Sequence, residues 1–397
     1  MSTFPRTQII VILGALSAFG SLSIDMYLPS LPTLQHDFAT TQLGTQLTLA
    51  AFFIGFALGQ AFVGPLSDRF GRKPPLVIGL ALYVISSLGC AFAPSIDALT
   101  ALRFIQGLGA CSGVVIARAV VRDLFPAQET PHIFASLILV MGVAPVLAPL
   151  LGGYLLAFAG WQAIFWTLAC IGTVILLASA LRLPESHQPT AEHSLAFGAV
   201  FARYGKLLRE RHYLGYTLIT GISFSGMFAY IAGSPFVFIE LYRVPAHDFG
   251  WFFGLNALGL VGASQFNRLL HRFIDTFGLL RIAVIVQTTA GVALLLTGAT
   301  GAGGLTGVMI PLFVYIASIG LIAPNATALA MAPHARNAGS ASALMGTLQF
   351  GIAAIAAVAV GSIHVHSALP MSAVIAACGV LALSVMVIML KNVPRLA

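Results

Sequence analysis

Charged residues are scarce in this sequence. Only 8% of its 397 residues are Asp, Glu, Lys or Arg, whereas soluble domains carry about 25%. Hydrophobic residues make up 58% of the chain, and its mean hydropathy is +0.96. A chain this apolar could not cover a water-exposed surface with polar groups. The composition therefore excludes an ordinary soluble protein and indicates that a lipid bilayer is its solvent.

Cysteine is also rare, and familiar catalytic motifs are missing. The four cysteines lie in apolar runs and form no CxxC pair, so the sequence supports neither a disulfide framework nor a zinc site. There is no P-loop, GxSxG or HExxH motif, so ATP-driven pumping and hydrolysis have no support. We expect no enzyme, no metal site and no cofactor. The cysteines, interpreted as small packing residues, are Cys90, Cys111, Cys170 and Cys378.

The apolar residues form twelve runs of about 20 residues, the length that spans a bilayer. In a first half they cover residues 7–29, 44–66, 75–93, 98–120, 132–157 and 162–182. In a second half they cover residues 213–234, 248–270, 280–298, 305–329, 338–361 and 369–391. The sequence thus predicts an all-α membrane protein of twelve transmembrane helices in two six-helix halves, residues 1–182 and 213–397, joined by a polar linker at 183–212.

The net charge of +7 is better explained by topology than by nucleic acid. The basic residues stand in short clusters between apolar runs and form no continuous basic face, so we expect no nucleic-acid partner. Only Arg243 falls in a loop on the other side, and Arg103 lies within a span. By the positive-inside rule, both termini are expected in the cytoplasm of a bacterial inner-membrane protein. The 17 remaining basic residues share one side: Arg6, Arg69, Arg72, Lys73, Arg118, Arg122, Arg182, Arg203, Lys206, Arg209, Arg211, Arg268, Arg272, Arg281, Arg336, Lys391 and Arg395.

A charged loop joins the second and third spans and is a candidate gating element. Gly71 permits a tight turn between adjacent helices, and the neighbouring cations suit anionic lipid headgroups. Asp68 lies where its carboxylate can contact the positive N-terminus of a helix, a contact that would form when the cytoplasmic side closes. The alternative is a plain charged loop that only sets topology. The gating candidates are Gly64, Asp68, Arg69, Gly71, Arg72 and Lys73.

Two charges inside the spans are the most anomalous residues of the chain. Asp25 lies near the outer end of the first span, and Arg103 lies near the outer beginning of the fourth. At about 1.5 Å rise per residue, both fall within one or two helical turns of the same edge, so they can meet or line one cavity. Intramembrane charges are costly and usually functional. The alternative is that Asp25 caps its span and Arg103 reaches outward to the interface.

Proline and glycine gather in the fifth span. Pro145 and Pro149 bend a helix, while the adjacent Gly152 and Gly153 let another helix approach closely. Other polar or aromatic residues in the spans could line a substrate cavity, although interhelical hydrogen bonds, or lipid-facing packing for the aromatic rings, are their ordinary roles. This tentative cavity set is Tyr27, Gln106, Phe224, Phe228, Asn256 and Asn325.

These motifs together resemble a known family. The loop Gly64-Pro-Leu-Ser-Asp68-Arg69-Phe-Gly71-Arg72-Lys73 resembles the signature loop of the major facilitator superfamily. With Ser-Ile-Asp25-Met-Tyr-Leu-Pro29 and Arg103-Phe-Ile-Gln-Gly107, it resembles the bicyclomycin/chloramphenicol resistance family of drug:proton antiporters. The fifth span resembles the antiporter signature, but Ala148 stands where glycine is usual. The resemblance implies an acid at Asp25 with Arg103 as its partner base.

The expected function is therefore proton-coupled efflux of small drug-like or antibiotic molecules by alternating access. The proton gradient would drive it, without a cofactor, and the expected partners are substrate, protons and lipid around a monomer. A proton-coupled symporter or exporter of a metabolite on the same fold is the alternative. It would need dedicated hydrogen-bonding groups in the cavity, and few charges stand there. Glu240, at the outer end of the seventh span, is a second candidate for a titrating group.

Overall fold

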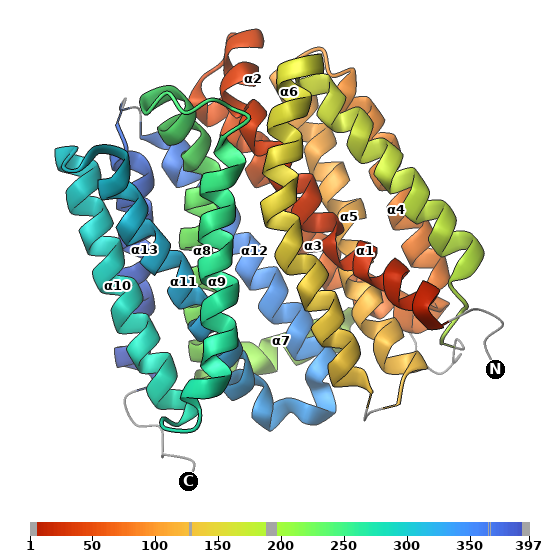
Figure 1. The fold of residues 1–397 in the computed structure, drawn as a ribbon. Helices are drawn as coiled ribbons and strands as arrows, with labels where there is room; N and C mark the ends of the chain where they lie inside the picture. Colours follow the sequence, from red (N-terminus) through yellow and green to blue (C-terminus); the bar gives the residue numbers. More distant parts are fainter. Residues whose placement is uncertain (1–5, 127–128, 188–196, 364, 366, 391–397) are drawn as a thin grey trace.

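The computed structural model describes residues 6–126, 129–187, 197–363, 365 and 367–390. Within these ranges every regular element is a helix. The first six crossings and the second six are joined by α7 (Figure 1). The helices are α1 (Arg6–Asp25), η1 (Leu28–Ser30), α2 (Leu31–Asp37), α3 (Gln42–Phe70), α4 (Lys73–Ala91), α5 (Ile96–Leu124), α6 (Thr130–Arg182), α7 (Phe197–Arg209), α8 (Arg211–Pro235), η2 (Phe236–Leu241), α9 (Phe249–Leu270), α10 (Thr276–Thr300), α11 (Gly304–Met331), η3 (Ala332–Asn337), α12 (Ala338–Ser362) and α13 (Leu369–Met389).

These elements make the twelve expected crossings. α6 contains two of them, which turn at Gly160, where the backbone has φ 74° and ψ 176°. The α1–η1–α2 segment makes one crossing and α8 with η2 makes another. By length and composition alone, ten described stretches qualify as spans, because α9 is not among them and α6 counts once, as Ala144–Arg182. α9 carries Asn256, Gln265 and Asn267, which lower its apolar character.

The turns between helices follow from ordinary capping chemistry. Thr41, Ser95 and Asp275 each precede a helix and accept a hydrogen bond from the backbone N–H three residues later, at 3.2, 3.2 and 3.3 Å. α4 and α13 carry proline in their first turn, where it loses no hydrogen bond. α10 stops at Gly301, a left-handed residue at φ 69°. The helices accordingly begin about where the apolar runs predicted, with small shifts of edge.

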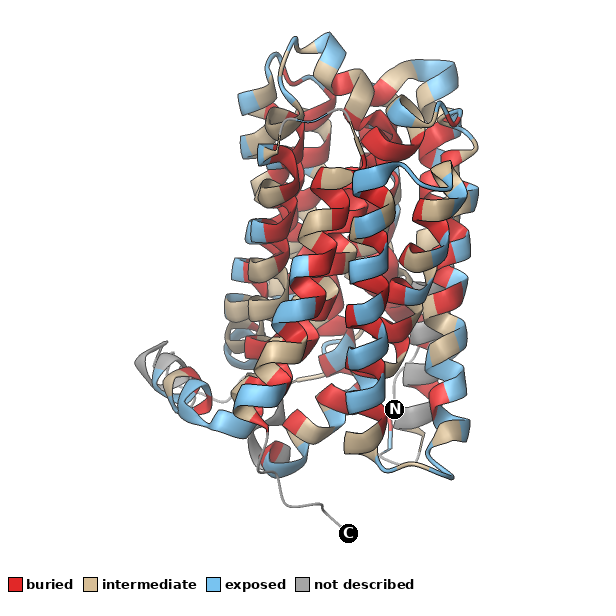
Figure 2. Ribbon diagram, turned by 90° about the vertical axis from the view of Figure 1, so that its left-hand side faces the viewer, coloured by how far each residue is buried: buried red, intermediate tan, exposed pale blue. Residues whose placement is uncertain are grey.

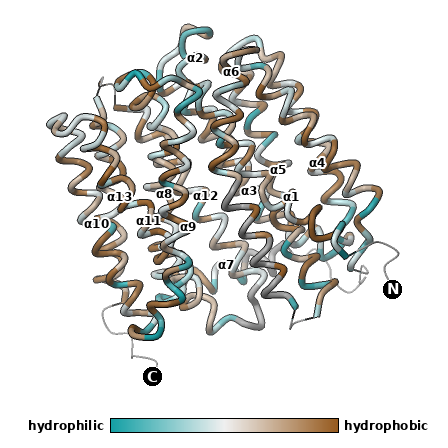
Figure 3. The backbone as a smooth tube through the Cα atoms, in the orientation of Figure 1, coloured by the Kyte–Doolittle hydropathy of each residue, from teal (hydrophilic) through white to brown (hydrophobic). Residues whose placement is uncertain are grey.

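Large apolar side chains cover the outside of the bundle, including Ile78, Phe158, Trp251 and Ile388. Figure 2 shows exposed positions running along the outer helices, and Figure 3 shows hydrophobic colour along them, with hydrophilic colour mainly toward the ends. Such a surface is unfavourable in water and suits lipid.

Two hydrophobic cores divide the interior. We call the end where α1 begins and α13 ends the basic end, and the other the opposite end. One core unites α1–α6 with the opposite-end parts of α8–α13. The second core lies at the basic end and consists only of residues from α7, α8 and α10–α13. The first six and second six crossings therefore share a core at the opposite end but not at the basic end.

The linker has more structure than its polar sequence predicted. It contains α7, which buries Tyr204 and Leu207 in the second core, and Arg203 donates a hydrogen bond to Ser340 Oγ at 3.1 Å. α8 begins at Arg211, inside the range expected to be linker. The expected linker thus packs against the second six crossings through an amphipathic helix.

Candidate functional site

The first crossing breaks at Asp25. α1 ends there, and the chain passes through the short η1 turn before α2 resumes. Pro29 and Pro32 stand at the starts of η1 and α2, where proline ends one helix and can begin the next. Asp25 is 4% exposed. No hydrogen bond or ion pair of the described residues involves its carboxylate, so it is a buried acid without a protein partner in that part of the chain.

Arg103 on α5 lies at the same level and is fully buried. Its Nη1 donates to the carbonyl oxygen of Ser23 at 3.2 Å and to Gln106 Oε1 at 2.5 Å. Within the described part of the chain, Nε and Nη2 have no hydrogen-bond partner. The guanidinium carbon stands 4.5 Å from the ring centre of Tyr27, 4.4 Å from Phe52 and 5.9 Å from Phe165. The cation is thus held chiefly by aromatic faces, an attraction of about 2 kcal/mol or more when desolvated.

The structure places Asp25 and Arg103 at one depth without joining them. Arg103 reaches the carbonyl of Ser23, two residues before Asp25, but the described residues include no ion pair between the two side chains. The rings of Tyr27, Phe52 and Phe165 surround the Arg103 guanidinium, where the sequence predicted the Asp25 carboxylate. In this arrangement the two charged side chains have separate surroundings.

A hydrogen-bond network fixes the residues around Arg103. Ser23 Oγ and Tyr83 Oη lie 2.7 Å apart, joining α1 to α4. Gln106 Nε2 donates to Ser87 Oγ at 2.7 Å, so Gln106 orients Arg103 and is itself oriented from α4. Tyr27 Oη and Thr48 Oγ1 lie 2.8 Å apart. Of the tentative cavity residues, Tyr27 and Gln106 therefore surround the buried cation. Sequence reasoning missed their partners because small hydroxyl residues in apolar runs carry no distinct signal.

An aromatic cluster lies where the first six and second six crossings meet. Phe53 on α3 contacts Phe228 on α8, with ring centres 4.7 Å apart, and Phe350 on α12 lies 4.5 Å from Phe56. Phe224 is half-buried against the same core. Phe228 therefore packs between the two sets of helices and does not face lipid.

The two asparagines of the tentative cavity set bind neighbouring helices. Asn256 donates to Tyr230 Oη at 3.1 Å, and Asn325 donates to Asn267 Oδ1 at 2.8 Å. Both side chains are buried. They act here as interhelical hydrogen-bond groups, the second of the two roles that the sequence left open.

Close backbone approach at Gly152 and Gly153 seals the opposite end. A Cβ built on Gly152 would collide with the carbonyl oxygen of Met26, beside the break in the first crossing. A Cβ on Gly153 would collide with the carbonyl oxygen of Ala246 and lie 3.0 Å from the Cα of His247, in the second six crossings. Pro149 is buried and Pro145 half-buried in the same helix. The glycine pair thus lets α6 contact the break in the first crossing and the loop before α9 at the same time.

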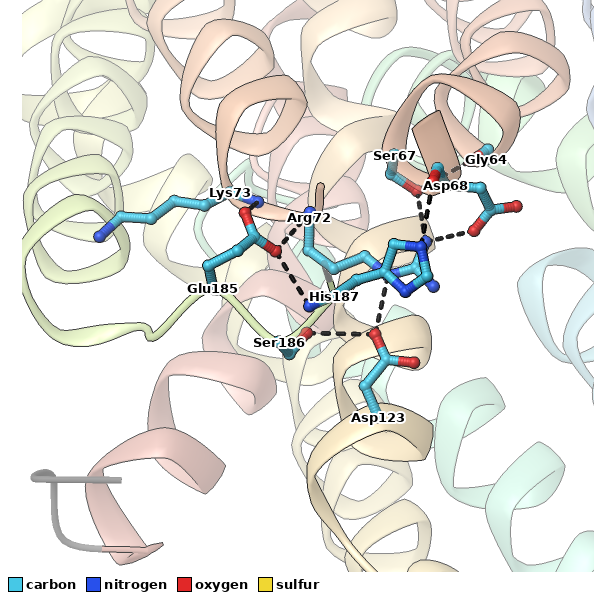
Figure 4. A network of polar contacts seen from close by, with 9 residues as sticks. All are labelled: Gly64, Ser67, Asp68, Arg72, Lys73, Asp123, Glu185, Ser186 and His187. Atoms are coloured by element: carbon cyan, nitrogen blue, oxygen red, sulfur yellow. Dashed lines mark hydrogen bonds and ion pairs between the residues drawn. The ribbon is translucent and has the colours of Figure 1, made fainter. Parts of the chain in front are cut away.

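The loop between α3 and α4 forms a polar network at the basic end (Figure 4). Arg72 donates to Asp123 Oδ2 at 2.8 Å, to Ser67 Oγ at 3.0 Å and to the Asp68 carboxylate. Burial alone would lower the pKa of Arg72, but Asp123 and Asp68 outweigh it and raise that pKa above its ordinary value. Arg72 therefore stays charged and ties α3 to α5.

Asp68 does not contact a helix N-terminus in this arrangement. Its carboxylate is 57% exposed and pairs with Arg72, four residues on. The N-terminus of α4 is bound instead by Glu185, which accepts from the backbone N–H groups of Arg72 at 2.7 Å and Lys73 at 3.0 Å. Gly71, at φ 88°, supplies the turn, and a Cβ there would press against Glu185. Sequence analysis overlooked Glu185, which stands in Leu-Pro-Glu-Ser directly after the sixth crossing.

The other loop residues have looser surroundings. Arg69 is exposed and lies over the ring of Phe70 at 5.2 Å. A Cβ on Gly64 would find no atom within 4 Å. Nothing from the second six crossings presses on Gly64 here, in keeping with the separate cores at the basic end.

Comparisons with known proteins agree with this architecture. The pattern of the Major Facilitator Superfamily matches residues 12–358. A relative from Bacillus subtilis, an uncharacterized MFS-type transporter named YdgK, is 39% identical, with 93% of this chain and 92% of the relative covered. A bicyclomycin resistance protein homolog from Haemophilus influenzae is 34% identical over 94% and 93% of the two chains. The multidrug resistance protein MdtL of Escherichia coli O157:H7 is 31% identical over 59% of each.

Solved structures with the same fold are more distant in sequence. A D-xylose–proton symporter superposes with a TM-score of 0.76 at 16% identity, covering 98% of each chain. A bacterial homolog of the lysosomal transporter Spinster, in an inward-facing and unoccupied conformation, gives 0.74 at 14% identity over 99% of each chain.

Proposed function

Because this chain belongs to the major facilitator superfamily, and within it to the bicyclomycin/chloramphenicol resistance family, we propose that it is a proton-driven exporter of small drug-like molecules. The chain is a non-enzymatic, multi-pass bacterial membrane transporter. We propose two further properties, which are exchange of the substrate for protons and a drug-like substrate. The names of relatives such as the multidrug resistance protein MdtL support them.

The observation that carries the proposal is the buried acid Asp25, which lies at the level of a buried cation that has other partners. Arg103 is held by Ser23, Gln106 and the rings of Tyr27 and Phe52 without an ion pair to Asp25 among the described residues, so a neutral Asp25 is compatible with this arrangement. A charged Asp25 would attract the guanidinium and compete with the rings. Loss of the proton is therefore coupled to movement of Arg103, which lies on α5 against the break in α1.

The break after α1 contacts the close packing at Gly152 and Gly153 that seals the opposite end. Met26, next to Asp25, packs against Gly152, and Gly153 packs against the second six crossings. We propose that a change at Asp25 reaches this seal through Met26. The halves 1–182 and 213–397 would then rock about the linker 183–212, which exchanges the open and closed ends.

We further propose that the basic end faces the cytoplasm, because 17 of the 19 basic residues lie there by the expected topology. Asp68 would then act as a latch. Its pairing with Arg72 would be exchanged for a helix N-terminus of the second half when the cytoplasmic side closes, with Gly64 giving that half room to approach.

The test is transport by purified protein in proteoliposomes under an imposed pH gradient. Bicyclomycin, chloramphenicol and D-xylose serve as separate substrates. Antiport predicts that substrate moves against the direction of proton flow and that a protonophore stops it. Movement with the protons would establish symport and overturn the proposal, and transport of D-xylose alone would overturn the drug-like substrate.

A further inference from the structure

The Asp25 side chain is directed away from Arg103. Ser23, two residues earlier in α1, points toward α4, because its hydroxyl pairs with Tyr83 Oη at 2.7 Å. Residues two apart lie about 200° apart around a helix, so they point to opposite sides. Asp25 therefore points away from the network that holds Arg103, which explains why the described residues include no ion pair between the two buried charges.

Helices of the second six crossings approach the break after α1. The η1 turn, which begins three residues after Asp25, lies against α8. The carbonyl oxygen of Met26 lies against Gly152 of α6, and α6 packs in turn on α9, where Leu150 contacts the backbone at Gly250. The break therefore meets α8 directly and is linked to α9 through α6.

Tyr230 on α8 is an ionisable neighbour of Asp25 across this boundary. It is 2% exposed, and the Asp25 carboxylate acts electrostatically on its hydroxyl. In the loop before α9, His247 and Asp248 pair with each other at 3.6 Å. The buried acid thus has an electrostatic partner in the second six crossings. Arg103 has separate partners, all in the first six crossings: Tyr27, Tyr83 and Cys90.

Asn256 on α9 binds this tyrosine and has a free acceptor. Its Nδ2 donates to Tyr230 Oη at 3.1 Å and to the carbonyl oxygen of Phe252 at 3.2 Å. A carbonyl oxygen can only accept, so the amide nitrogen must face it. Asn256 Oδ1 is consequently left without a partner among the described residues, although Asn256 is only 1% exposed. A buried acceptor without a donor is unfavourable, so this oxygen requires a donor.

Together, Tyr230 and Asn256 are complementary to a neutral carboxylic acid. Such an acid has a carbonyl oxygen that accepts and an O–H that donates. Tyr230 Oη accepts from Asn256 and keeps its own hydrogen for donation to the carbonyl oxygen of the acid, while Asn256 Oδ1 can accept from the O–H of the acid. An ionised carboxylate would use the tyrosine but leave Asn256 Oδ1 unpartnered. The two groups therefore favour the protonated form of Asp25.

We propose that Tyr230 and Asn256 are positioning residues for the proton step, which bind the protonated Asp25 side chain and thereby hold the two sets of crossings together at the opposite end. The inference rests on the proposed function, because it takes Asp25 as the proton carrier. Neither hydrogen bond to Asp25 is present among the described residues, so binding includes a turn of this side chain toward the pair. Loss of the proton removes the donor for Asn256 Oδ1, which weakens the joined arrangement and lets the opposite end open.

The hydrogen bonds can be tested by infrared difference spectroscopy between acidic and alkaline buffer, on the full-length protein in lipid nanodiscs. The C=O band of protonated Asp25 is the band that Asp25→Asn removes. Tyr230→Phe and Asn256→Leu should each move this band, the first to higher frequency because the C=O group loses a hydrogen bond. Tyr315→Phe is the matched control and should leave the band in place, since the Tyr315 hydroxyl is buried without a partner in the described part of the chain.

The spectra separate this inference from the proposed function. A band that Asp25→Asn removes but that stays in place in both Tyr230→Phe and Asn256→Leu would overturn the inference and leave Asp25 as the proton carrier. If Asp25→Asn removes no band, Asp25 does not carry the proton, and the inference falls with that role. An equal movement of the band in Tyr315→Phe would show a general disturbance of the second six crossings and would also overturn the inference.

The holding action is measured by double electron–electron resonance. Spin labels are placed at His36→Cys on α2 and Ala302→Cys after α10, both exposed, in a Cys170→Ser background that removes the exposed native cysteine. Acidification should shift the distance distribution toward its shorter component, and Tyr230→Phe and Asn256→Leu should each lose about half or more of that shift. No shift on acidification, or an undiminished shift in both variants, would overturn the holding action.

Discussion

Replacing Gly153 with alanine should weaken the seal at the opposite end. The added Cβ would collide with the carbonyl oxygen of Ala246 and lie 3.0 Å from the Cα of His247, both backbone atoms that cannot rotate away. Overpacking of this kind costs typically about 1–3 kcal/mol. Because the collision occurs only while the two sets of crossings touch there, the whole cost falls on the closed arrangement.

The expected result is a shift of about 5- to 150-fold in the ratio of closed to open molecules, taking tenfold per 1.4 kcal/mol. The assay is double electron–electron resonance between spin labels attached at His36→Cys and Ala302→Cys, two exposed positions at the opposite end. Gly262→Ala is the matched control, because a Cβ at Gly262 in α9 meets no atom within 4 Å. If Gly153→Ala leaves the distances as in Gly262→Ala, the glycine pair does not set closure and the reasoning fails.

Three further substitutions follow from the network at the basic end and from the buried cation. Asp68→Asn should slow transport and leave substrate affinity within about twofold by equilibrium dialysis, since Asp68 is exposed and far from Arg103; loss of binding would move Asp68 into the site. Glu185→Gln should lower the midpoint of thermal unfolding by a few degrees, because a charged partner is lost at the N-terminus of α4, an interaction of about 0.3–1 kcal/mol; an unchanged midpoint would contradict the capping role. Arg103→Lys should retain less than about a tenth of transport, because lysine lacks the planar guanidinium that lies over the rings of Tyr27 and Phe52; near-normal transport would show that only the charge matters.

Most of the architecture could be predicted from the sequence, because the thickness of the bilayer sets the length of a transmembrane helix. The apolar runs located twelve crossings, and the shifts at their ends reflect capping residues such as Thr41 and Ser95, which extend helices past the apolar part. The turn inside α6 falls at Gly160, within the gap between the expected spans 132–157 and 162–182. α7 was missed because its apolar residues are few and lie within a polar stretch.

The candidate site was predicted only in part. Charge anomaly and depth led to Asp25 and Arg103, but the rings around Arg103 come from Tyr27, Phe52 and Phe165, in three different crossings. Aromatic residues are common in apolar runs, so nothing local marks those that face a cation. The contacts of a buried arginine depend on how the helices pack in three dimensions. Residue spacing along the chain predicts only the depth of the arginine in the membrane.

The central claim is that Asp25 carries the proton exchanged for substrate. The most direct measurement is proton release from purified, weakly buffered protein when a transported drug is added, comparing wild type with Asp25→Asn. That change keeps the shape of the side chain but cannot titrate. The account predicts proton release from wild type and none from Asp25→Asn, while the variant still binds drug. Equal release from both proteins would contradict it and would direct attention to Glu240.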